Sequence, residues 1–292
     1  MNNTDTSFKY KKILNCGGKL IDISEPIVMG ILNITLDSFY DGGKYITEKE
    51  ILIKAENILK EGGKIIDIGA YSSRPGAKNI SEDEELERLF DALKHIRKEF
   101  PETIISVDTF RSNVAKRVVN EFAVSIINDI SAGNMDENMF KTISELNVVY
   151  IMMHMQGNPQ NMQNNPVYDD IMKDIILYFA EKIEKLKSLG FNNIILDPGF
   201  GFGKTLNHNY ILLNNLEVLK NFELPFMVGI SRKSMIYKLL NTTPEKSLTG
   251  TIVLNTIALE SGVNILRVHD VQEAVETINL YKKIKETKNK DN

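Results

Sequence analysis

Short apolar runs and longer amphipathic segments alternate along this chain. Eight of the apolar runs end in small or polar residues and lack strict alternation of apolar and polar positions, which is typical of strands buried on both faces of a parallel sheet. These runs are Ile27–Ile34, Lys64–Gly69, Thr103–Thr109, Ser125–Ser131, Val148–His154, Asn193–Gly199, Pro225–Ser231 and Asn264–Asp270. We therefore predict eight buried parallel strands.

The segments between these runs carry helical signals. Thr47 and Glu50 predict a capping box at the start of one helix, and Ser81 and Glu84 predict another. Apolar residues follow each of these pairs at positions that fall on one helix face. Helices are therefore expected after the first two strands.

A third helix is predicted over Tyr168–Leu189, where apolar residues recur at helical spacing. Gly190 stands where a glycine commonly ends a helix. Alternation of strand and helix through eight units predicts an α/β fold, a (β/α)8 TIM barrel. We expect this barrel to span residues 26–282.

The region before the first strand has a different pattern. The runs Tyr10–Leu14 and Lys19–Ile23 flank a turn-like segment, Asn15-Cys16-Gly17-Gly18. This arrangement predicts a β-hairpin, which would close the bottom of the barrel. Residues 1–25 would form an N-terminal extension and hairpin, and the Lys-rich tail 283–292 is expected to fray.

Composition narrows the class of protein. The chain has 292 residues, slightly more than the roughly 250 residues of one such barrel, so a single large domain is expected. The net charge of −4 disfavours broad nucleic-acid binding, because no global basic field exists. Cys16 is the only cysteine, which excludes an internal disulfide. Met1–Lys12 carries no apolar signal segment, and no run approaches the roughly 20 residues of a membrane span. We therefore expect a cytoplasmic protein without a membrane or nucleic-acid partner.

Polar residues recur where the predicted strands end. Because parallel barrels keep their chemistry at the carboxyl ends of the strands, we expect these residues to meet at one mouth. They are Asn33, Asp67, Asp108, Asn128, His154, Asp197, Ser231, Lys233, Arg267 and His269. Two glycine-containing loops, Thr35–Lys44 and Ala70–Lys78, follow the first two strands and could order around a substrate.

Structural explanations exist for several of these residues. Asp67 and Asp129 could simply brace turns, and His154 could be a buried structural histidine.

Two further motifs fail on spacing. Gly203-Lys204-Thr205 resembles the end of a Walker A loop, but the required first glycine falls on Pro198. Gly199-Phe-Gly-Phe-Gly lacks the spacing of a dinucleotide site.

Eight segments in fixed order carry a specific resemblance to a known family. They are Gly30-Ile-Leu-Asn-Ile-Thr-Leu-Asp-Ser-Phe, Asp67-Ile-Gly-Ala-Tyr-Ser-Ser-Arg-Pro-Gly, Ser106-Val-Asp-Thr-Phe-Arg, Ile127-Asn-Asp-Ile-Ser-Ala-Gly, Met153-His-Met-Gln-Gly, Asp197-Pro-Gly-Phe-Gly-Phe-Gly-Lys-Thr, Ser231-Arg-Lys and Arg267-Val-His-Asp. From about Pro26 to Leu280 the chain resembles the dihydropteroate synthases. The resemblance implies condensation of 6-hydroxymethyl-7,8-dihydropterin diphosphate with 4-aminobenzoate and release of diphosphate.

The resemblance also implies roles for single residues. Asp108, Asp197, Lys233 and Arg74 would be catalytic. The implied pterin pocket consists of Ser73, Asp108, Asn128, Asp197 and Lys233. A carboxylate such as that of Asp197 can accept two hydrogen bonds from an aminopyrimidine edge, and the Lys233 ammonium can donate to the ring carbonyl.

The remaining implied contacts concern the other two substrate groups. The diphosphate would be held by Asn33, Arg74, Arg267 and His269, with Mg²⁺ touching Asn33. The planar fork of arginine suits phosphate, and Mg²⁺ usually takes few protein ligands besides phosphate oxygens. The aminobenzoate would contact Phe39, Pro75, Phe202, Lys233 and Ser234. The family further implies a homodimer.

Departures from the family pattern fall on three sites, with Leu36, Ala70-Tyr71 and Gln156 in place of the usual residues. None removes a group that the reaction needs. The alternatives are a pterin-dependent methyltransferase, a non-catalytic pterin-binding paralogue and a barrel acting on sugar phosphates. The first two would not need the full set of anion-holding residues, and the third would lack Asp197-Pro-Gly and Arg267-Val-His together.

Overall fold

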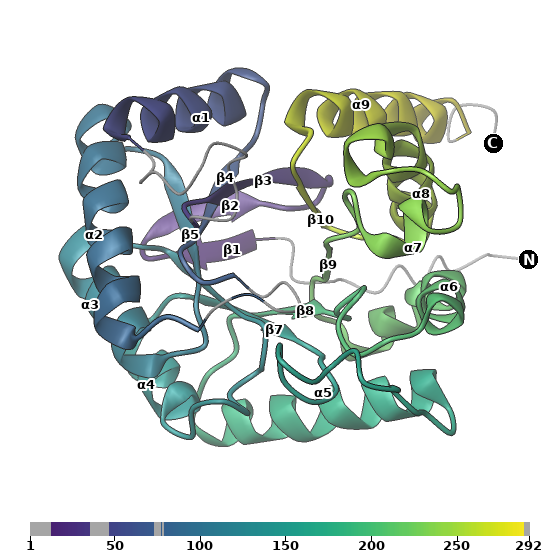
Figure 1. The fold of residues 1–292 in the computed structure, drawn as a ribbon, viewed down its shortest axis with the longest axis horizontal. Coiled ribbons are helices and arrows are strands. Elements are labelled where there is room, and N and C mark those ends of the chain that lie inside the picture. Colours follow the sequence, from purple (N-terminus) through teal and green to yellow (C-terminus); the bar gives the residue numbers. More distant parts are fainter. Residues whose placement is uncertain (1–12, 36–46, 73–76, 78, 289–292) are drawn as a thin grey trace, which may run out of the picture.

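Eight parallel strands form a nearly closed barrel (Figure 1). The computed structural model describes residues 13–35, 47–72, 77 and 79–288. The barrel strands are β3 (Ile27–Asn33), β4 (Ile65–Gly69), β5 (Ile104–Asp108), β6 (Ile126–Asp129), β7 (Val149–Met153), β8 (Ile194–Asp197), β9 (Met227–Val228) and β10 (Ile265–Val268). Their order is β8-β7-β6-β5-β4-β3-β10-β9. The predicted TIM barrel is confirmed.

The ring closes between β8 and β9, the two strands at the ends of this order. Leu196 forms an isolated parallel bridge with Phe226, and its N–H donates to the Pro225 carbonyl at 2.9 Å. The β9 strand has only two residues, so its ladder is shorter than the run Pro225–Ser231 predicted. The other strands lie within their predicted runs, and every residue of β4, β6, β7 and β8 is buried.

Helices surround the barrel (Figure 1). They are α1 (Glu48–Lys60), α2 (Glu82–Glu99), α3 (Ser112–Phe122), α4 (Met139–Leu146), α5 (Ile171–Ser188), α6 (Leu206–Asn214), α7 (Ser234–Tyr237), α8 (Leu248–Glu260) and α9 (Val271–Lys288), with short 3-10 helices η2 (Leu216–Phe222) and η3 (Pro244–Lys246). Helix α9 therefore continues past residue 282, where we expected the barrel to end.

The predicted capping boxes have different outcomes. Thr47 and Glu50 form both reciprocal hydrogen bonds at the start of α1, as predicted. At the start of α2 only half of the box forms. The Ser81 hydroxyl accepts from the Glu84 N–H at 3.1 Å, but the Glu84 carboxylate accepts from Arg88 at 2.5 Å instead of returning to Ser81. An ion pair one turn along the helix thus replaces the second bond of the box.

The end of α5 follows the prediction. The helix stops at Ser188, and Gly190 adopts a φ of 78°. This left-handed conformation is available to glycine without a steric cost, which explains a glycine at this helix end.

A β-hairpin closes the bottom of the barrel, as predicted. Strands β1 (Ile13–Cys16) and β2 (Lys19–Asp22) pair in antiparallel fashion. The turn itself is only Gly17-Gly18, both with positive φ, so Asn15 and Cys16 belong to β1 and not to the turn. The hairpin side chains Leu14, Cys16, Ile21 and Ile23 form one buried cluster with residues at the amino ends of the barrel strands: Met29, Ile65, Ile126, Val149, Ile195, Met227 and Ile265.

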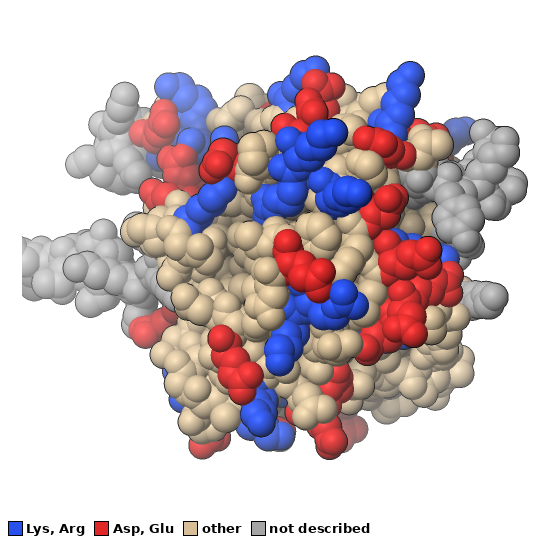
Figure 2. Space-filling view, turned by 90° about the vertical axis from the view of Figure 1, so that its left-hand side faces the viewer, with Lys and Arg blue, Asp and Glu red and all other residues tan. Residues whose placement is uncertain are grey.

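Charge on the helical face is mixed. Figure 2 shows acidic and basic side chains interspersed on the side covered by α2 and α3, with acidic side chains gathered toward one edge. In α2 the first turn is acidic and the last turn carries Arg97 and Lys98, the distribution that the helix dipole favours. Within the described ranges, no helix has both the length and the apolar character needed to cross a membrane.

The hairpin plug yields a test of stability. Leu14 is fully buried in the bottom cluster, whereas Leu20 on the same hairpin is 69% exposed. We expect Leu14→Ala to lower the free energy of unfolding by about 2–5 kcal/mol, because it removes buried methyl groups and leaves a cavity. Leu20→Ala should change it by less than about 0.5 kcal/mol. Chemical denaturation of both variants checks this, and equal losses would show that the hairpin does not plug the barrel.

Candidate active site

The inner surface of the barrel changes from apolar to polar along its axis. Inward-facing residues at the amino ends of the strands belong to the apolar cluster that packs against the hairpin. Two residues further along, the neighbouring strands present Asp67 beside Ser106, and then Asp108 beside Asn128. Because inward positions recur at every second residue, these polar groups form a layer just above the apolar one.

Arg267 on β10 lies at the centre of this polar layer. Its Nε donates to Asp67 Oδ2 at 2.7 Å, and its Nη2 donates to Asp108 Oδ2 at 2.9 Å. Asn128 Nδ2 donates to the same Asp67 oxygen at 3.2 Å. Burial lowers the pKa of Arg267, but the two carboxylates outweigh burial and hold this pKa above its usual value. Asp67 therefore does not brace a turn, the role that we considered from sequence; it binds Arg267.

This contact bears on the expected role of Arg267. The side chain is 18% exposed and points to two carboxylates inside the mouth. The guanidinium thus lies beside Asp108, which belongs to the expected pterin pocket. Contact of Arg267 with the diphosphate stays a prediction.

Asp197 ends β8 and is buried. Its Oδ1 accepts from the Gly199 N–H at 2.8 Å. Burial raises the pKa of Asp197, while the positive charge of Lys233, the Gly199 N–H and the charges of Arg267 and Lys204 lower it. The carboxylate is therefore surrounded by groups that favour its ionised form.

Lys233 reaches the same part of the mouth from the residue before α7. Its Nζ donates to the Phe200 carbonyl and lies 4.6 Å from the centroid of the Phe202 ring. Burial lowers the pKa of Lys233 to about 8, against the effect of Asp197. The structure thus brings Lys233 and Phe202 together, as expected for an aminobenzoate contact. Ser234 is the next residue and begins α7, a helix of a single turn.

The glycines between Asp197 and Lys204 allow close packing of this loop. Gly199 has a φ of 71°, and a Cβ there would lie 2.0 Å from the His154 carbonyl oxygen. At Gly203, also with positive φ, a Cβ would lie 2.6 Å from the Gln156 carbonyl oxygen. The glycine-rich motif therefore serves the packing of two loops, in agreement with our rejection of a dinucleotide site.

Ser231 and His269 lie side by side at the rim. The His269 N–H donates to Ser231 Oγ at 3.2 Å, and His269 Nδ1 lies 3.1 Å from the same oxygen. Arg232 turns away from the mouth and forms two hydrogen bonds with Asp270, at 2.5 and 3.0 Å. The motifs Ser231-Arg-Lys and Arg267-Val-His-Asp are thus joined to each other, which fixes His269 next to the Lys233 loop.

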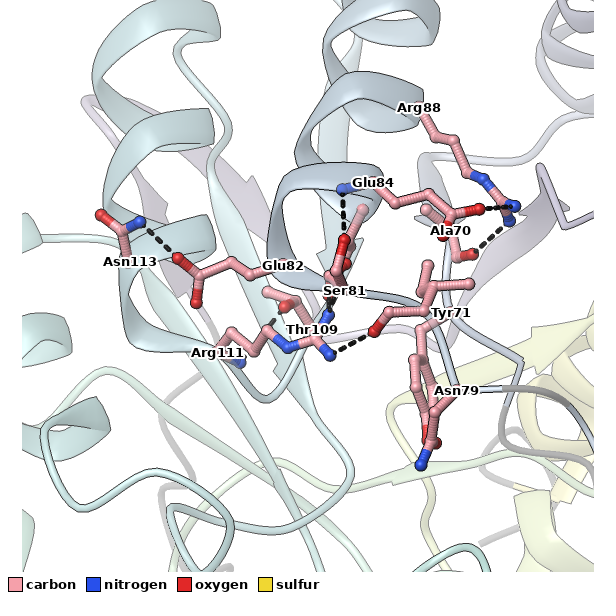
Figure 3. A network of polar contacts seen from close by, with 12 residues as sticks. Ala70, Tyr71, Asn79, Ser81, Glu82, Glu84, Arg88, Thr109, Arg111 and Asn113 are labelled. Carbon is pink, nitrogen blue, oxygen red and sulfur yellow. Dashed lines mark hydrogen bonds and ion pairs between the residues drawn. The ribbon is translucent and has the colours of Figure 1, made fainter.

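A polar network holds the connection between β4 and α2 (Figure 3). The Tyr71 hydroxyl donates to Asn79 Oδ1 at 2.6 Å, and Gln160 Nε2 donates to the Tyr71 oxygen at 2.8 Å. Arg111 donates to the Ile80 carbonyl at 2.7 Å. Tyr71, a departure from the family pattern, therefore ties the ends of this connection together.

Four expected site residues fall outside the described ranges: Phe39, Ser73, Arg74 and Pro75.

Asn33 ends β3 on the same side of the barrel and is partly buried. On the next strand, a Cβ at Gly69 would lie 3.4 Å from Asn33 Oδ1 and 3.5 Å from Asp108 Cβ, so the glycine leaves space between them. Among the residues described, no three His, Cys, Asp or Glu side chains gather as metal ligands. A single amide oxygen such as that of Asn33 suits Mg²⁺, which often takes one or two protein ligands and completes its shell with phosphate and water.

Comparison with known proteins identifies the family. The sequence pattern of the family described as "Pterin binding enzyme" matches residues 29–269. Dihydropteroate synthase of Escherichia coli strain K12 is 42% identical over 263 residues, 89% of this chain and 92% of the relative. The chain belongs to the dihydropteroate synthase family.

Solved structures of the family agree with this result. The dihydropteroate synthase of Yersinia pestis, solved with a sulfonamide drug complex, superposes with a TM-score of 0.89 at 41% identity and covers 94% of this chain and 99% of that one. The Xanthomonas albilineans enzyme, solved with 4-aminobenzoic acid, gives a TM-score of 0.86 at 31% identity, with 94% and 98% covered. The predicted family and fold are confirmed.

Sequence reasoning missed or left open several residues near this site. Asp67 was expected at the mouth, with a turn brace as the structural alternative, but its pairing with Arg267 was not predicted, although a carboxylate in the middle of a buried strand requires a cationic partner. Lys204 was set aside with the failed Walker A motif, yet its Nζ is buried beside His154 at 3.0 Å from Nδ1. His154 is 5% exposed and lies behind the site, in agreement with the structural alternative. Asp129 accepts from Ser131 and Gly133 and braces a turn, as considered.

The electrostatics predict an unusual titration of Lys233. Because burial lowers its pKa to about 8, the side chain should be an ammonium below this pH and a neutral amine above it. The Lys233 resonance can be assigned in a ¹³C NMR spectrum of labelled lysines as the one that is missing from the Lys233→Arg variant. In the wild type this resonance should titrate near pH 8, well below the pKa of about 10.4 of exposed lysines. If that resonance titrates together with the exposed lysines, the proposed desolvation of Lys233 is wrong.

Proposed function

We propose that the protein condenses 6-hydroxymethyl-7,8-dihydropterin diphosphate with 4-aminobenzoate, giving 7,8-dihydropteroate and diphosphate. One observation carries this proposal: Asp108, Asp197, Lys233 and Arg267 meet at one barrel mouth in a member of the dihydropteroate synthase family. Carboxylates next to placed cations suit a reaction in which positive charge develops on one group and negative charge leaves with another.

The pterin ring would occupy the layer between Asp108 and Asp197. Asp197 would accept from the amino-pyrimidine edge, and the Lys233 ammonium would donate to the ring carbonyl. Asn128 would contribute its amide, and Ser73 is proposed as a further contact. Arg267 supports this pocket because it donates a hydrogen bond to Asp108 and its positive charge also lowers the pKa of Asp197.

The chemical step would be dissociative. The bond between the methylene carbon and the diphosphate oxygen breaks first, and the electron pair leaves with the diphosphate. The resulting cation is delocalised over the dihydropterin and stabilised by Asp108 and Asp197. Burial raises the pKa of Asp108 to about 7 even though Arg267 lowers it, so the carboxylate form of Asp108 predominates only above neutral pH. The aniline nitrogen of 4-aminobenzoate then forms the C–N bond and loses a proton to solvent.

The leaving group and the second substrate would use the rim. Asn33, Arg74, Arg267 and His269 are proposed to hold the diphosphate. Mg²⁺ bound by Asn33 and phosphate oxygens would share the negative charge that develops there. The proposed aminobenzoate contacts are Phe39, Pro75, Phe202, Lys233 and Ser234. The 4.6 Å contact of Lys233 with the Phe202 ring supports this last set.

An assay with defined substrates tests the reaction. Purified protein with the pterin diphosphate, 4-aminobenzoate and Mg²⁺ should release diphosphate in step with dihydropteroate formation. Lys233→Ala and Asp197→Ala should each lower kcat/KM at least about 100-fold, because each removes a charge aimed at the reacting groups. The exposed residues Lys238 and Asp169 provide matched controls, and their alanine variants should keep full activity.

The outcomes separate the alternatives. Pterin binding without product would indicate a non-catalytic paralogue, and methyl transfer in place of condensation would indicate a methyltransferase. A sulfonamide should compete with aminobenzoate, and inhibition that is independent of aminobenzoate concentration would place the drug in another pocket.

We also propose that two copies associate through α7, α8 and α9. Large apolar side chains on α8, on α9 and in the turn that follows α7 are exposed by 42–70%: Leu239, Leu240, Val253, Ile257, Leu280 and Ile284. Exposed apolar groups gathered in this way are typical of interaction sites, and isologous dimers are the commonest assemblies.

The mass in solution tests this assembly. Light scattering after size exclusion should give a dimer for the wild type and a monomer for Ile257→Asp, because burying the new charge opposes association. Leu177→Asp, on α5 and 57% exposed, is the matched control and should remain a dimer. A monomeric wild type would contradict the proposal.

A further inference from the structure

The β8–α6 loop encloses a buried ammonium group. Lys204 is 4% exposed, and its Nζ lies 2.9 Å from the Gly199 carbonyl oxygen, 3.1 Å from that of Phe202 and 3.0 Å from His154 Nδ1. The His154 carbonyl oxygen is 3.3 Å away. We propose that Lys204 is a positioning residue: it holds this loop so that the Phe202 ring lies against Lys233 at the aminobenzoate subsite.

The acceptors around Lys204 match its donors. An ammonium has three N–H groups and no acceptor. Burial and the charge of Lys204 lower the pKa of His154 to about 2, so the imidazole is neutral and its Nδ1 can accept. The His154 ring is held edge-on to Tyr178 at a centroid distance of 4.8 Å. The lysine thus faces acceptors that are already fixed in place.

Lys204 binds the loop at both ends of its turn. Lys204 donates to the Gly199 carbonyl, and the Gly199 N–H in turn donates to Asp197. Lys204 also donates to the carbonyl of Phe202. Lys233 donates to the Phe200 carbonyl of the same loop. The two ammonium groups therefore bind different carbonyls of one loop, and loss of Lys204 would loosen the backbone that carries the Phe202 ring while Asp197 stays on its strand.

Burial of this cation is a cost that an apolar residue would avoid. Desolvation lowers the pKa of Lys204 to about 7, and Asp197 only partly opposes this. Buried charges are generally less favourable for stability than well-packed apolar groups of similar size. Asn209 and Gln163 bind the loop at Gly201, and the Tyr168 hydroxyl donates to the Gly203 carbonyl. The Phe202 N–H donates to the Gly199 carbonyl, and Lys204 donates to the carbonyls of both residues, so Lys204 is the side chain that joins Gly199 to Phe202.

A double-mutant cycle tests this inference, which rests on the proposed function. Lys204→Met should raise KM for 4-aminobenzoate about tenfold and change kcat less than about threefold. In a Phe202→Ala background the same substitution should raise KM no more than about twofold, because contacting residues are not additive. Lys187→Met, at an exposed position of α5, is the matched control. Multiplicative effects of the two substitutions would overturn the inference.

A second measurement is independent of activity. Amide hydrogen exchange of residues 199–205 should be at least about tenfold faster in Lys204→Met, with the exchange of β3 to β5 unchanged. Lys204→Gln keeps one donor group and should therefore show a smaller increase in the exchange rate of the same loop. This variant replaces Lys204→Met if the Met variant does not fold. Unchanged exchange in this loop would refute the positioning role even if the wild type catalyses the condensation. Faster loop exchange in a protein without condensation activity would refute the proposed function alone.

Discussion

The contact of Arg267 with Asp67 and Asp108 is the constraint on which the active site depends. It joins β10 to β4 and β5 across the inside of the barrel, at 2.7 and 2.9 Å. A guanidinium without partners could not remain there, because desolvation of a lone charge is too costly. The two carboxylates therefore fix the position of Arg267, and Arg267 in turn lowers the pKa of Asp108, which burial raises.

Charges of both signs lie close together in this mouth. The carboxyl groups of Asp108 and Asp197 lie near the cationic side chains of Arg267 and Lys233. Such an arrangement can stabilise a separating ion pair, with carboxylates near the developing cation and cations near the leaving anion. Such a site needs no nucleophile from the protein. Its effect comes from the low dielectric of a barrel closed at the other end by the hairpin.

Sequence reasoning gave the fold and most of the mouth because both follow from local periodicity. Continuous apolar runs indicated buried strands, and the barrel then brought Asp108, Asp197 and Lys233 to one end. What could not be predicted depended on side-chain direction and on contacts between distant segments. The preference of Glu84 for Arg88 over Ser81 is a competition between two bonds of similar strength. The burial of Lys204 follows from a loop path that only the packing of its glycines defines.

The layered interior explains how one barrel can hold so many buried charges. Ion pairs of this kind add little to stability, since the desolvation of their members offsets most of their attraction. The apolar layer beneath them, sealed by Leu14 and its neighbours, buries hydrocarbon without this cost. Inside the barrel, apolar packing therefore lies at the amino ends of the strands and the chemistry at the carboxyl ends, while the larger apolar core lies between the strands and the helices. Replacement of Arg267 and its two acidic partners by well-packed apolar residues could preserve the fold while removing the three charges that order this layer of the pocket.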